Sequence, residues 1–299
     1  MPYPSLITYP SDLLFPGSVA YGSSVAVGDL VMNVPGADGV MFVLSQFDGW
    51  GSPGSSVQVT QRARGAGGTA SEPFLKPRTM TMAGSITTTD PAALSDAVDR
   101  LIAAFTLDQF PLLVNESGRI RSVMAQRQDE VIVTWLNAYE AEFSAQVVAT
   151  DPLKYGDLVT ATTLLPTSTG GLVRPSTWPR TWTGVSNSGA ITITNDGNTD
   201  APVWLRIDGP IPAGGWTVTH VGKKQTLSFA TSLALGAGEF VTVDMGRREV
   251  LAQGQSTRNG YVSSRGWFTL DPGDNTIAFS AANYSPTAQL TVTTKPAWS

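Results

Sequence analysis

Alternation of apolar and polar residues with a period of two is the feature that most limits what this chain can fold into. An alternating segment presents one apolar face only when it is extended, so each one predicts a half-buried β-strand. Val, Thr and Ile, which favour strands, are frequent in these segments. The segments in the first half of the chain are 24–31, 39–46, 56–62, 79–87, 119–126, 130–137 and 139–149. The pattern predicts an all-β protein.

One segment, 90–105, has a helical period instead. It begins with Asp90 and Pro91, a pair suited to the N-cap and first turn of a helix. Apolar residues then follow at a spacing that places them on one helical face: Leu94, Val98, Leu101 and Phe105. We predict a single helix over this range.

The segment 156–184 separates two strand-rich regions. Pro, Ser, Thr and Gly dominate it, which is typical of a linker or a long connecting loop. Strand patterns resume after it, with strong turn sequences between them. The predicted strands are 190–195, 203–209, 216–221, 225–229, 239–244, 249–251, 266–270, 275–280 and 288–293. We therefore predict a β-rich domain with one helix over 1–155 and a β-sandwich over 185–299.

The composition excludes several classes of protein. The 299 residues include no cysteine, so disulfides and thiolate metal sites are excluded. The N-terminus lacks the features of a secretory signal, and no apolar stretch approaches the roughly 20 residues of a membrane span. We expect a soluble protein that needs no cofactor. Only 14% of the residues are charged, which is typical of a subunit whose surfaces meet neighbours.

The net charge of −5 is unevenly divided along the chain. Residues 1–155 contain 9 Lys and Arg against 15 Asp and Glu, which gives −6. Residues 156–299 contain 10 against 9, which gives +1. Neither half carries the basic field that a nucleic-acid-binding protein needs.

Residues with catalytic chemistry are few. The single histidine, His220, lies in a strand pattern, and no Gly-x-Ser-x-Gly motif supplies a nucleophile. The glycine-rich loop that starts at Gly65 lacks the Lys and the following helix of a phosphate-binding loop. Glu140 and Glu142 share one strand face and would serve a glycosidase if their carboxylates lay a few ångströms apart. Nothing near them distinguishes the pair from ordinary surface residues, and we predict no enzyme.

Tryptophans gather in the second half of the chain. Trp204, Trp216 and Trp267 lie within strand patterns and are interpreted as core residues. Trp178 and Trp182 lie in the connecting segment and are the candidates for an interface or a glycan contact. Because aromatic platforms on β-sandwiches bind sugars, a carbohydrate-binding module is an alternative function.

Four motifs between residues 143 and 279 form a recognisable series. The first is a strand that ends in Asp151-Pro152-Leu-Lys-Tyr155, and the second is the strand 191–195 followed by Asp-Gly-Asn and Ala-Pro-Val. The third is a strand that ends in Asp244, followed by Arg-Arg-Glu-Val. The fourth is Trp267-x-x-Leu-x-Pro272-Gly273-x-Asn275. In this order and spacing, the series resembles the distal tail proteins of siphoviruses, the long-tailed bacteriophages.

The resemblance implies both a fold and a role. The fold would be an N-terminal belt domain with one helix, plus a C-terminal galectin-like β-sandwich. The belt domains would form a hexameric ring that joins the tail tube to the tip, baseplate or fibre proteins in the virion. The partners would be copies of the chain and neighbouring tail proteins, with no membrane, and DNA would only pass through the channel. The His-x-Asn-Pro-Arg motif of sugar-binding galectins is missing, so sugar binding is not implied. A tail module that binds a carbohydrate or receptor on the host surface remains the alternative.

The division of charge predicts where DNA would pass. Lys and Arg on a channel wall would hold the phosphates, whereas acidic residues would let DNA slide. We therefore hypothesise that part of the −6 of residues 1–155 lines the channel.

Overall fold

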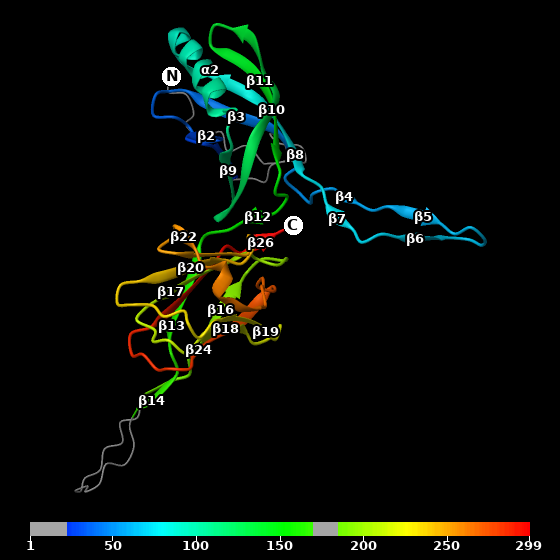
Figure 1. The fold of residues 1–299 in the computed structure, drawn as a ribbon. Helices are drawn as coiled ribbons and strands as arrows, with labels where there is room; N and C mark the ends of the chain where they lie inside the picture. The colour runs from blue at the N-terminus through cyan, green and yellow to red at the C-terminus, as the bar shows by residue number, and fades with distance from the viewer. Residues whose placement is uncertain (1–22, 170–184) are drawn as a thin grey trace, which may run out of the picture. The chain divides into compact units, whose positions relative to one another are not determined.

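The computed structural model describes residues 23–169 and 185–299, and in these ranges the chain is mostly β-strand with one α-helix (Figure 1). The predicted all-β class with a single helix is confirmed. The chain divides into two compact units, Met1–Tyr155 with Ser299, and Gly156–Trp298. Within the described residues, no helix has the length and apolar character needed to cross a membrane.

The first unit is built on an antiparallel sheet with the strand order β2-β1-β9-β10-β11-β8-β3. Its strands are β1 (Ser24–Val27), β2 (Leu30–Met32), β3 (Met41–Asp48), β8 (Arg78–Thr87), β9 (Phe110–Glu116), β10 (Arg119–Asn137) and β11 (Glu140–Ala149). The long β10 pairs with β9 along its first part and with β11 along its second part. It therefore joins the two halves of the sheet. The short β12 (Lys154–Tyr155) also pairs with β10.

Helix α2 (Pro91–Ala104) shares one hydrophobic core with this sheet. The Asp90 carboxylate caps it by accepting a hydrogen bond from the backbone N–H of Ala92 at 3.0 Å. The buried face of the helix consists of Leu94, Ala97, Val98 and Leu101. Phe105 follows the helix, is buried, and contacts Phe110 edge to face. The predicted helix is therefore confirmed, with its cap and its apolar face.

A long hairpin, which we call the arm (residues 51–77), leaves the sheet between β3 and β8 (Figure 1). It consists of two short ladders, in which β4 (Ser55–Ser56) pairs with β7 (Phe74–Leu75) and β5 (Val59–Gln61) pairs with β6 (Gly68–Ala70). All of its residues are exposed except Pro53 and Gly68. Among the described elements, none covers the arm beyond Pro53, so its exposed side chains add nothing to the core of their own unit.

The second unit is a sandwich of two antiparallel sheets. One has the strand order β13-β25-β17-β20-β21-β22, and the other β16-β24-β18-β19-β23. The first sheet comprises β13 (Val159–Leu164), β17 (Val203–Asp208), β20 (Phe240–Asp244), β21 (Glu249–Ala252), β22 (Ser256–Thr257) and β25 (Gln289–Thr294). The second comprises β16 (Ala190–Asn195), β18 (Trp216–His220), β19 (Gln225–Phe229), β23 (Val262–Arg265) and β24 (Gly273–Ala281). A separate ladder joins β14 (Thr167–Thr169) to β15 (Val185–Asn187). Alternate residues of both sheets fill the core between them.

Several predicted boundaries are wrong. The range 24–31 is a hairpin rather than one strand, because Gly28, with a φ of +56°, turns the chain between β1 and β2. The ranges 119–126 and 130–137 are one strand, β10, in which a bulge absorbs the irregularity of the pattern. The range 266–270 is not a strand, and the edge of the second sheet is formed by β23 instead.

The segment 156–184 is not a connecting loop throughout. Its residues 159–164 form β13, which pairs with β25 along its whole length. Of the threonines of this edge strand, Thr160 and Thr162 are exposed, whereas Thr163 is buried. The strand β9 was not predicted, although Phe110, Leu112 and Val114 alternate in it as buried residues.

Candidate assembly and binding sites

None of the residues considered for catalysis lies in an arrangement typical of an active site. His220 makes structural hydrogen bonds, and Glu140 and Glu142 line an open groove. His220 is 2% exposed, its Nε2 lies 3.0 Å from Oδ1 of Asn275, and its Nδ1 accepts from the backbone N–H of Lys223. Both ring nitrogens are therefore used in structural hydrogen bonds. The described residues contain no group of three or more His, Asp or Glu side chains that could hold a metal ion. The Gly65 loop is the exposed end of the arm rather than a phosphate cradle before a helix.

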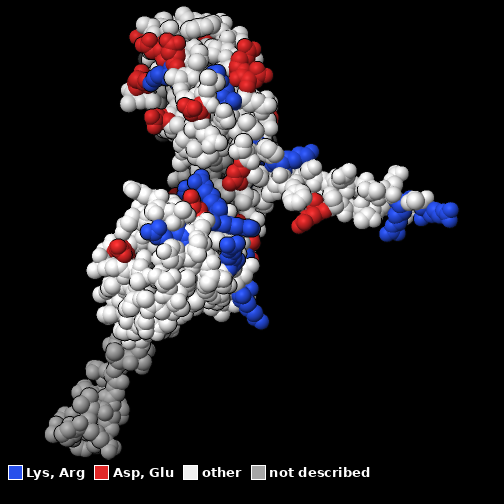
Figure 2. Space-filling model, in the orientation of Figure 1, with Lys and Arg blue, Asp and Glu red and all other residues white. Residues whose placement is uncertain are grey.

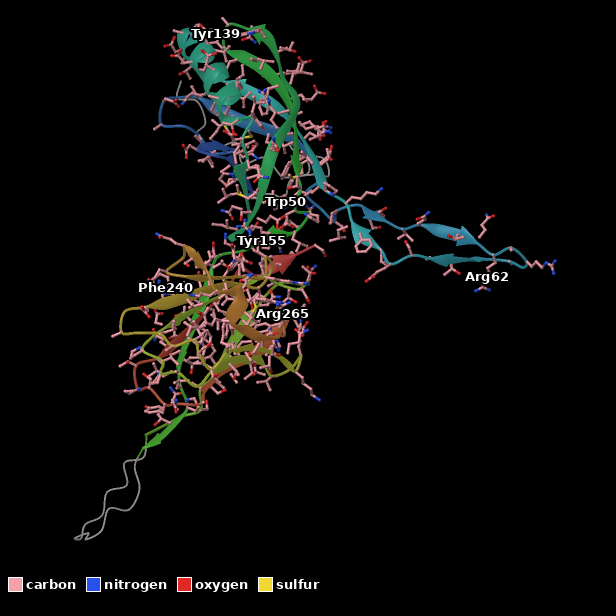
Figure 3. The ribbon with its side chains drawn as sticks, viewed as in Figure 1. Trp50, Arg62, Tyr139, Tyr155, Phe240 and Arg265 are labelled. Atoms are coloured by element: carbon pink, nitrogen blue, oxygen red, sulfur yellow. The ribbon has the colours of Figure 1, made fainter. Side chains whose placement is uncertain are left out.

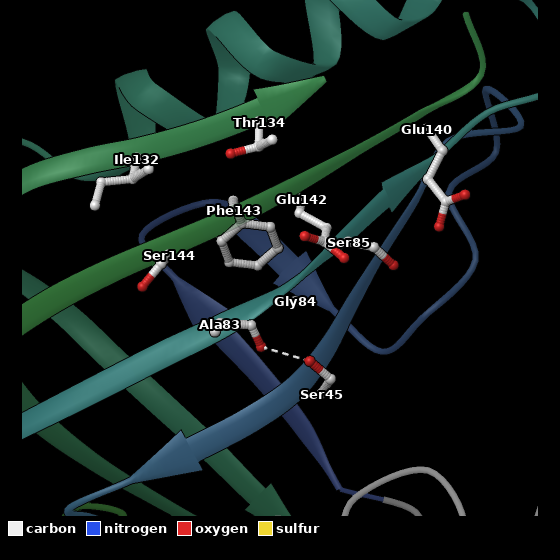
Figure 4. Close-up of a pocket in the computed structure, with 10 residues that line it drawn as sticks. All are labelled: Ser45, Ala83, Gly84, Ser85, Ile132, Thr134, Glu140, Glu142, Phe143 and Ser144. Atoms are coloured by element: carbon white, nitrogen blue, oxygen red, sulfur yellow. Dashed lines mark hydrogen bonds between the residues drawn. The ribbon is translucent and has the colours of Figure 1, made fainter. Parts of the chain in front are cut away.

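Glu140 and Glu142 line a groove of about 490 Å³ on the sheet face formed by β3, β8, β11 and β10 (Figure 4). The other lining residues are mostly small or hydroxyl-bearing: Ser45, Ala83, Gly84, Ser85, Ile132, Thr134, Phe143 and Ser144. No Lys or Arg is among them. The groove is thus shallow, polar and acidic.

The arm exposes apolar side chains that no part of the described chain covers. The exposed fractions are 63% for Val59 and 67% for Phe74, and Val57 and Leu75 are also exposed. At its end the arm carries Arg62 and Arg64, and the sequence from 51 to 71 contains no acidic residue. Figure 2 shows these basic side chains at the end of the arm and Figure 3 labels Arg62 there. A hairpin with an apolar stalk and a basic end is suited to contact another molecule.

The arm is held at its root by Arg78, which is 1% exposed. The Nη1 of Arg78 lies 2.7 to 3.0 Å from the carbonyl oxygens of residues 49–51, where the chain enters the arm. Its Nε and Nη2 donate to the carbonyl oxygen of Pro152 at 3.1 and 2.8 Å. One guanidinium therefore fastens the root of the arm to the Asp-Pro motif at the end of the unit. Burial lowers the pKa of Arg78.

Lys154 is a second buried cation at the same place. Its ammonium donates to the carbonyl oxygens of Trp50 and Gly51 at 3.0 and 3.1 Å. It also lies 5.2 Å from the centre of the ring of Trp50, which Figure 3 labels. Burial, together with the positive charges of Arg78 and Arg121, lowers the pKa of Lys154 to about 8.

One carboxylate, Glu116, offsets part of this positive charge. Its Oε1 accepts from the indole N–H of Trp50 at 2.8 Å, and its Oε2 forms an ion pair with Arg121 at 2.9 Å. The root of the arm is therefore fixed by a network that combines backbone carbonyls, one aromatic ring and charged groups. Such a network defines one orientation for the arm at its origin.

The motif Asp151-Pro152-Leu-Lys-Tyr155 forms a closed turn beside this network. Asp151 accepts from the backbone N–H of Leu153 at 3.0 Å and from the hydroxyl of Tyr155 at 2.6 Å. Burial and the bond to the Asp151 carboxylate raise the pKa of the Tyr155 phenol. The residue pattern is thus explained by local structure: Asp151 closes the turn, while Pro152 and Lys154 bind the arm root.

The motif around Asn275 organises a turn in the second unit. Asn275 is 3% exposed, donates to the carbonyl oxygens of Asp271 and Gly273 at 2.8 Å, and accepts from the N–H of Asp271. Gly273 has a φ of +92°, a conformation that favours glycine. Pro272 lies exposed in the same turn. Asn275 therefore locks the turn and links it to His220.

The tryptophans of the second unit do not share one environment. Trp216 is buried and stacks on Phe229 with 3.7 Å between ring centres. Trp267 is only partly buried and lies outside the strands. Trp204 is also partly buried, and its indole N–H donates to Asp244 on the outer face of a sheet. Interpreting all three as core is therefore wrong for Trp204 and Trp267. Trp178 and Trp182 lie outside the described residues.

Sequence reasoning missed the arm root. The available signal was that Arg78 occupies the buried phase of β8, which it shares with Met80, Met82 and Ile86. A charged residue in the apolar phase of an alternating strand must find buried partners, which here are carbonyl oxygens.

Comparisons with known proteins relate the second unit to a family of phage tail components and the fold of the chain to phage tail proteins. Residues 196–298 match a family model described as "Siphovirus-type tail component, C-terminal domain". A comparison with curated proteins gave no match. A solved structure of the SPP1 Dit protein, described as a paradigm of the hub adsorption apparatus of phages that infect Gram-positive bacteria, superposes with a TM-score of 0.65. It covers 92% of this chain and 98% of that chain, at 12% sequence identity.

A second solved structure, that of the phage P2 baseplate in its activated conformation with Ca, gives a TM-score of 0.50. It covers 91% of this chain and 97% of the matched chain, at 9% identity. At these identities the structures show a shared fold. The resemblance to siphovirus distal tail proteins is thereby confirmed: residues 196–298 match the C-terminal domain of siphovirus-type tail components, and the chain has the fold of a phage tail hub protein.

Proposed function

We propose that the chain is a structural, non-enzymatic protein of the phage virion, which forms a hexameric ring at the tail tip. The ring connects the tail tube to the tip, baseplate or fibre proteins and leaves a channel for DNA. The first unit forms the ring, and the second unit serves contacts with neighbouring tail proteins. The family match and the shared fold support the general role. The observation that carries ring formation is the uncovered arm.

The arm supplies an apolar surface that the described part of the chain leaves exposed and that another molecule can bury. Exposed Val59 and Phe74 gain little from folding of their own unit, since their apolar surface stays in water. Burying both against a neighbour would stabilise an assembly by a few kcal/mol in total, at roughly 25 cal/mol per Å². The fixed root lowers the cost of association, because the arm needs little ordering there.

The charges of the first unit favour a second copy of this chain as the neighbour. Figure 2 shows acidic side chains gathered at the end of the unit that holds α2 and the tip of the β10–β11 hairpin. Apart from the carboxylates of the groove described above, the helix α2 and its cap carry Asp90, Asp96 and Asp99 at that end. The basic end of an arm complements this surface on the next copy. Such a head-to-tail contact repeats around an axis and closes into a ring.

The groove on β3, β8, β11 and β10 has the chemistry of a channel wall. It is lined by hydroxyl groups, small residues and the carboxylates of Glu140 and Glu142, without Lys or Arg (Figure 4). A wall of this kind repels phosphates rather than binding them. This face is therefore our candidate for the acidic lining of the channel.

The experiment that tests the proposal is the oligomeric state of the full chain. Light scattering after size exclusion and negative-stain electron microscopy should find a sixfold ring at high concentration, alone or with neighbouring tail proteins. The variant V59S/F74S should shift the protein toward monomer. The matched control V221S/Y284S changes two exposed apolar residues of the second unit and should assemble normally. A protein that stays monomeric in every mixture, or that is missing from purified virions, would contradict the proposal.

A further inference from the structure

A groove of about 320 Å³ lies on the outer face of the six-stranded sheet of the second unit, away from the sandwich core. Its lining comes from four neighbouring strands, β25, β17, β20 and β21. The strand register places one row of side chains across it: Thr293 opposite Trp204, Trp204 opposite Asp244, and Asp244 opposite Glu249. A hydroxyl, an indole and two carboxylates are therefore aligned on one face.

The indole of Trp204 is held in place before any ligand arrives. Its N–H donates to Oδ2 of Asp244 at 3.1 Å, while Oδ1 of Asp244 accepts from the backbone N–H of Arg247 at 2.9 Å. The ring is partly buried, so one part of its surface faces the groove. An aromatic ring with a fixed orientation is a suitable platform for the C–H face of a sugar.

A fixed cation lies in the next row of the same face. The Nε and Nη2 of Arg206 donate to the Asp208 carboxylate at 2.8 to 3.1 Å. The guanidinium carbon lies 3.9 Å from the centre of the Phe240 ring, which Figure 3 labels. None of these contacts uses Nη1, so Arg206 retains N–H donors for a ligand.

An acceptor lies at the other end of the row. Glu249 lines the groove, and within the described residues its carboxylate has no hydrogen-bond or ion-pair partner. Donors from Arg206, the Glu249 acceptor and the hydroxyls of Thr242 and Thr293 surround the indole. Hydroxyl groups on a sugar ring need this mixture, because each of them donates and accepts.

The charges and the apolar surface of this unit select the ligand class. Three carboxylates in and beside the groove, Asp208, Asp244 and Glu249, outnumber two guanidinium groups. Both guanidinium groups are already paired, Arg206 with Asp208 and Arg247 with Asp244, which disfavours anionic ligands. The large exposed apolar residues of the unit, such as Tyr284 and Val221, do not line the groove. A protein interface would normally require about 800 Å² on each partner with an apolar centre, which this groove does not offer.

We propose that this groove binds a neutral hexopyranose glycan, one or two sugar units long. Trp204 stacks on the sugar ring, and Arg206 and Glu249 hydrogen-bond its hydroxyl groups. The site is independent of the arm and of ring formation. Its lining residues are all described and do not include Trp178 and Trp182, the positions at which the sequence predicts a glycan contact.

The test is saturation-transfer NMR and calorimetric titration of the full chain. The probes are glucose, galactose, mannose, N-acetylglucosamine and their disaccharides, with glucuronic acid as the anionic comparison. At least one neutral sugar should bind saturably, and more strongly than glucuronic acid. W204A and E249Q should each weaken binding about tenfold, which is the size expected for the loss of a stacking or charged hydrogen-bond contact.

Further variants distinguish the loss of a sugar contact from the loss of folded structure. W204F keeps an aromatic platform and should retain most of the binding, while the lost bond to Asp244 lowers the melting temperature by only a few degrees. The control W135A removes an exposed tryptophan of the first unit and should bind normally. Absence of saturable binding to every neutral sugar overturns the inference, as does equal binding by the wild type and E249Q. Ring formation by E249Q should be normal in either case, so this result is distinguishable from failure of the proposed function.

Discussion

Arg78 donates two hydrogen bonds to the carbonyl oxygen of Pro152, which lies 74 positions further along the chain. Because Arg78 also binds the carbonyl oxygens of residues 49–51, it joins the beginning of the arm, the end of the arm and the close of the first unit. The position of the arm therefore depends on a residue that makes no contact with its exposed surface.

Replacing Arg78 with Met should destabilise the first unit by about 3 kcal/mol, because buried carbonyl oxygens lose their donors. The arm should also become more sensitive to proteases. Urea unfolding and limited proteolysis measure the two effects. R62M, at the exposed end of the arm, is the control and should stay within about 0.5 kcal/mol of the wild type. Equal stability of the two variants would show that Arg78 does not hold the root.

The buried ammonium of Lys154 should make stability depend on pH above neutrality. Its pKa is about 8 in the folded chain, against 10.5 for an ordinary lysine. Between these values the unfolded chain holds a proton that the folded chain has released, so the free energy of unfolding rises with pH. The slope is at most about 1.4 kcal/mol per pH unit.

The measurement compares the unfolding free energies of the wild type and K154M at pH 7.5 and pH 10. Other titrating groups cancel in the difference between the two proteins. The wild type should gain stability relative to K154M as the pH rises. A constant difference would mean that Lys154 titrates normally.

The phenol of Tyr155 should ionise at higher pH than an ordinary tyrosine, because burial and the Asp151 carboxylate raise its pKa. The difference in phenolate absorbance between the wild type and Y155F isolates its titration from the other tyrosines. Y155F should also cost about 1 kcal/mol of stability through the lost hydrogen bond. Titration of Tyr155 together with the exposed tyrosines would argue against the closed Asp-Pro turn.

Asn275 should contribute more to the second unit than any exposed position of its strand. N275A leaves the backbone groups of Asp271 and the ring of His220 without their partner, at a cost of about 3 kcal/mol. Thermal unfolding of T276A, the exposed neighbour on β24, provides the control. The inference about the turn fails if both variants melt at the same temperature.

The acidic groove should keep DNA from binding to the assembled ring. The variant E140K/E142K replaces two negative charges of this face with two positive ones, so the net charge of each subunit rises by 4. Its rings should retain duplex DNA in a gel-shift assay at low salt, with binding that weakens as salt rises. D157K/D196K makes the same change in charge on exposed residues of the second unit. Equal retention by both variants would mean that the groove does not face the channel.

The sequence by itself determined the local structure of much of this protein. The period of two predicts the strands, and Asp90-Pro91 with four apolar residues at helical spacing predicts the helix, because both patterns depend only on backbone geometry. The motif from Asp151 to Tyr155 also contributed to the resemblance to siphovirus distal tail proteins, and its turn is closed by residues four positions apart.

Tertiary structure decided which side chains meet. Nothing in the sequence near Arg78 indicates Pro152 as its partner, and alternation alone does not distinguish buried Trp216 from Trp204 at the groove. A one-residue shift in strand register would exchange the two faces of a sheet, and register is fixed by long-range pairing and core packing. The arm, the acidic groove and the candidate glycan site therefore exist only in the folded chain, where distant strands bring their residues together.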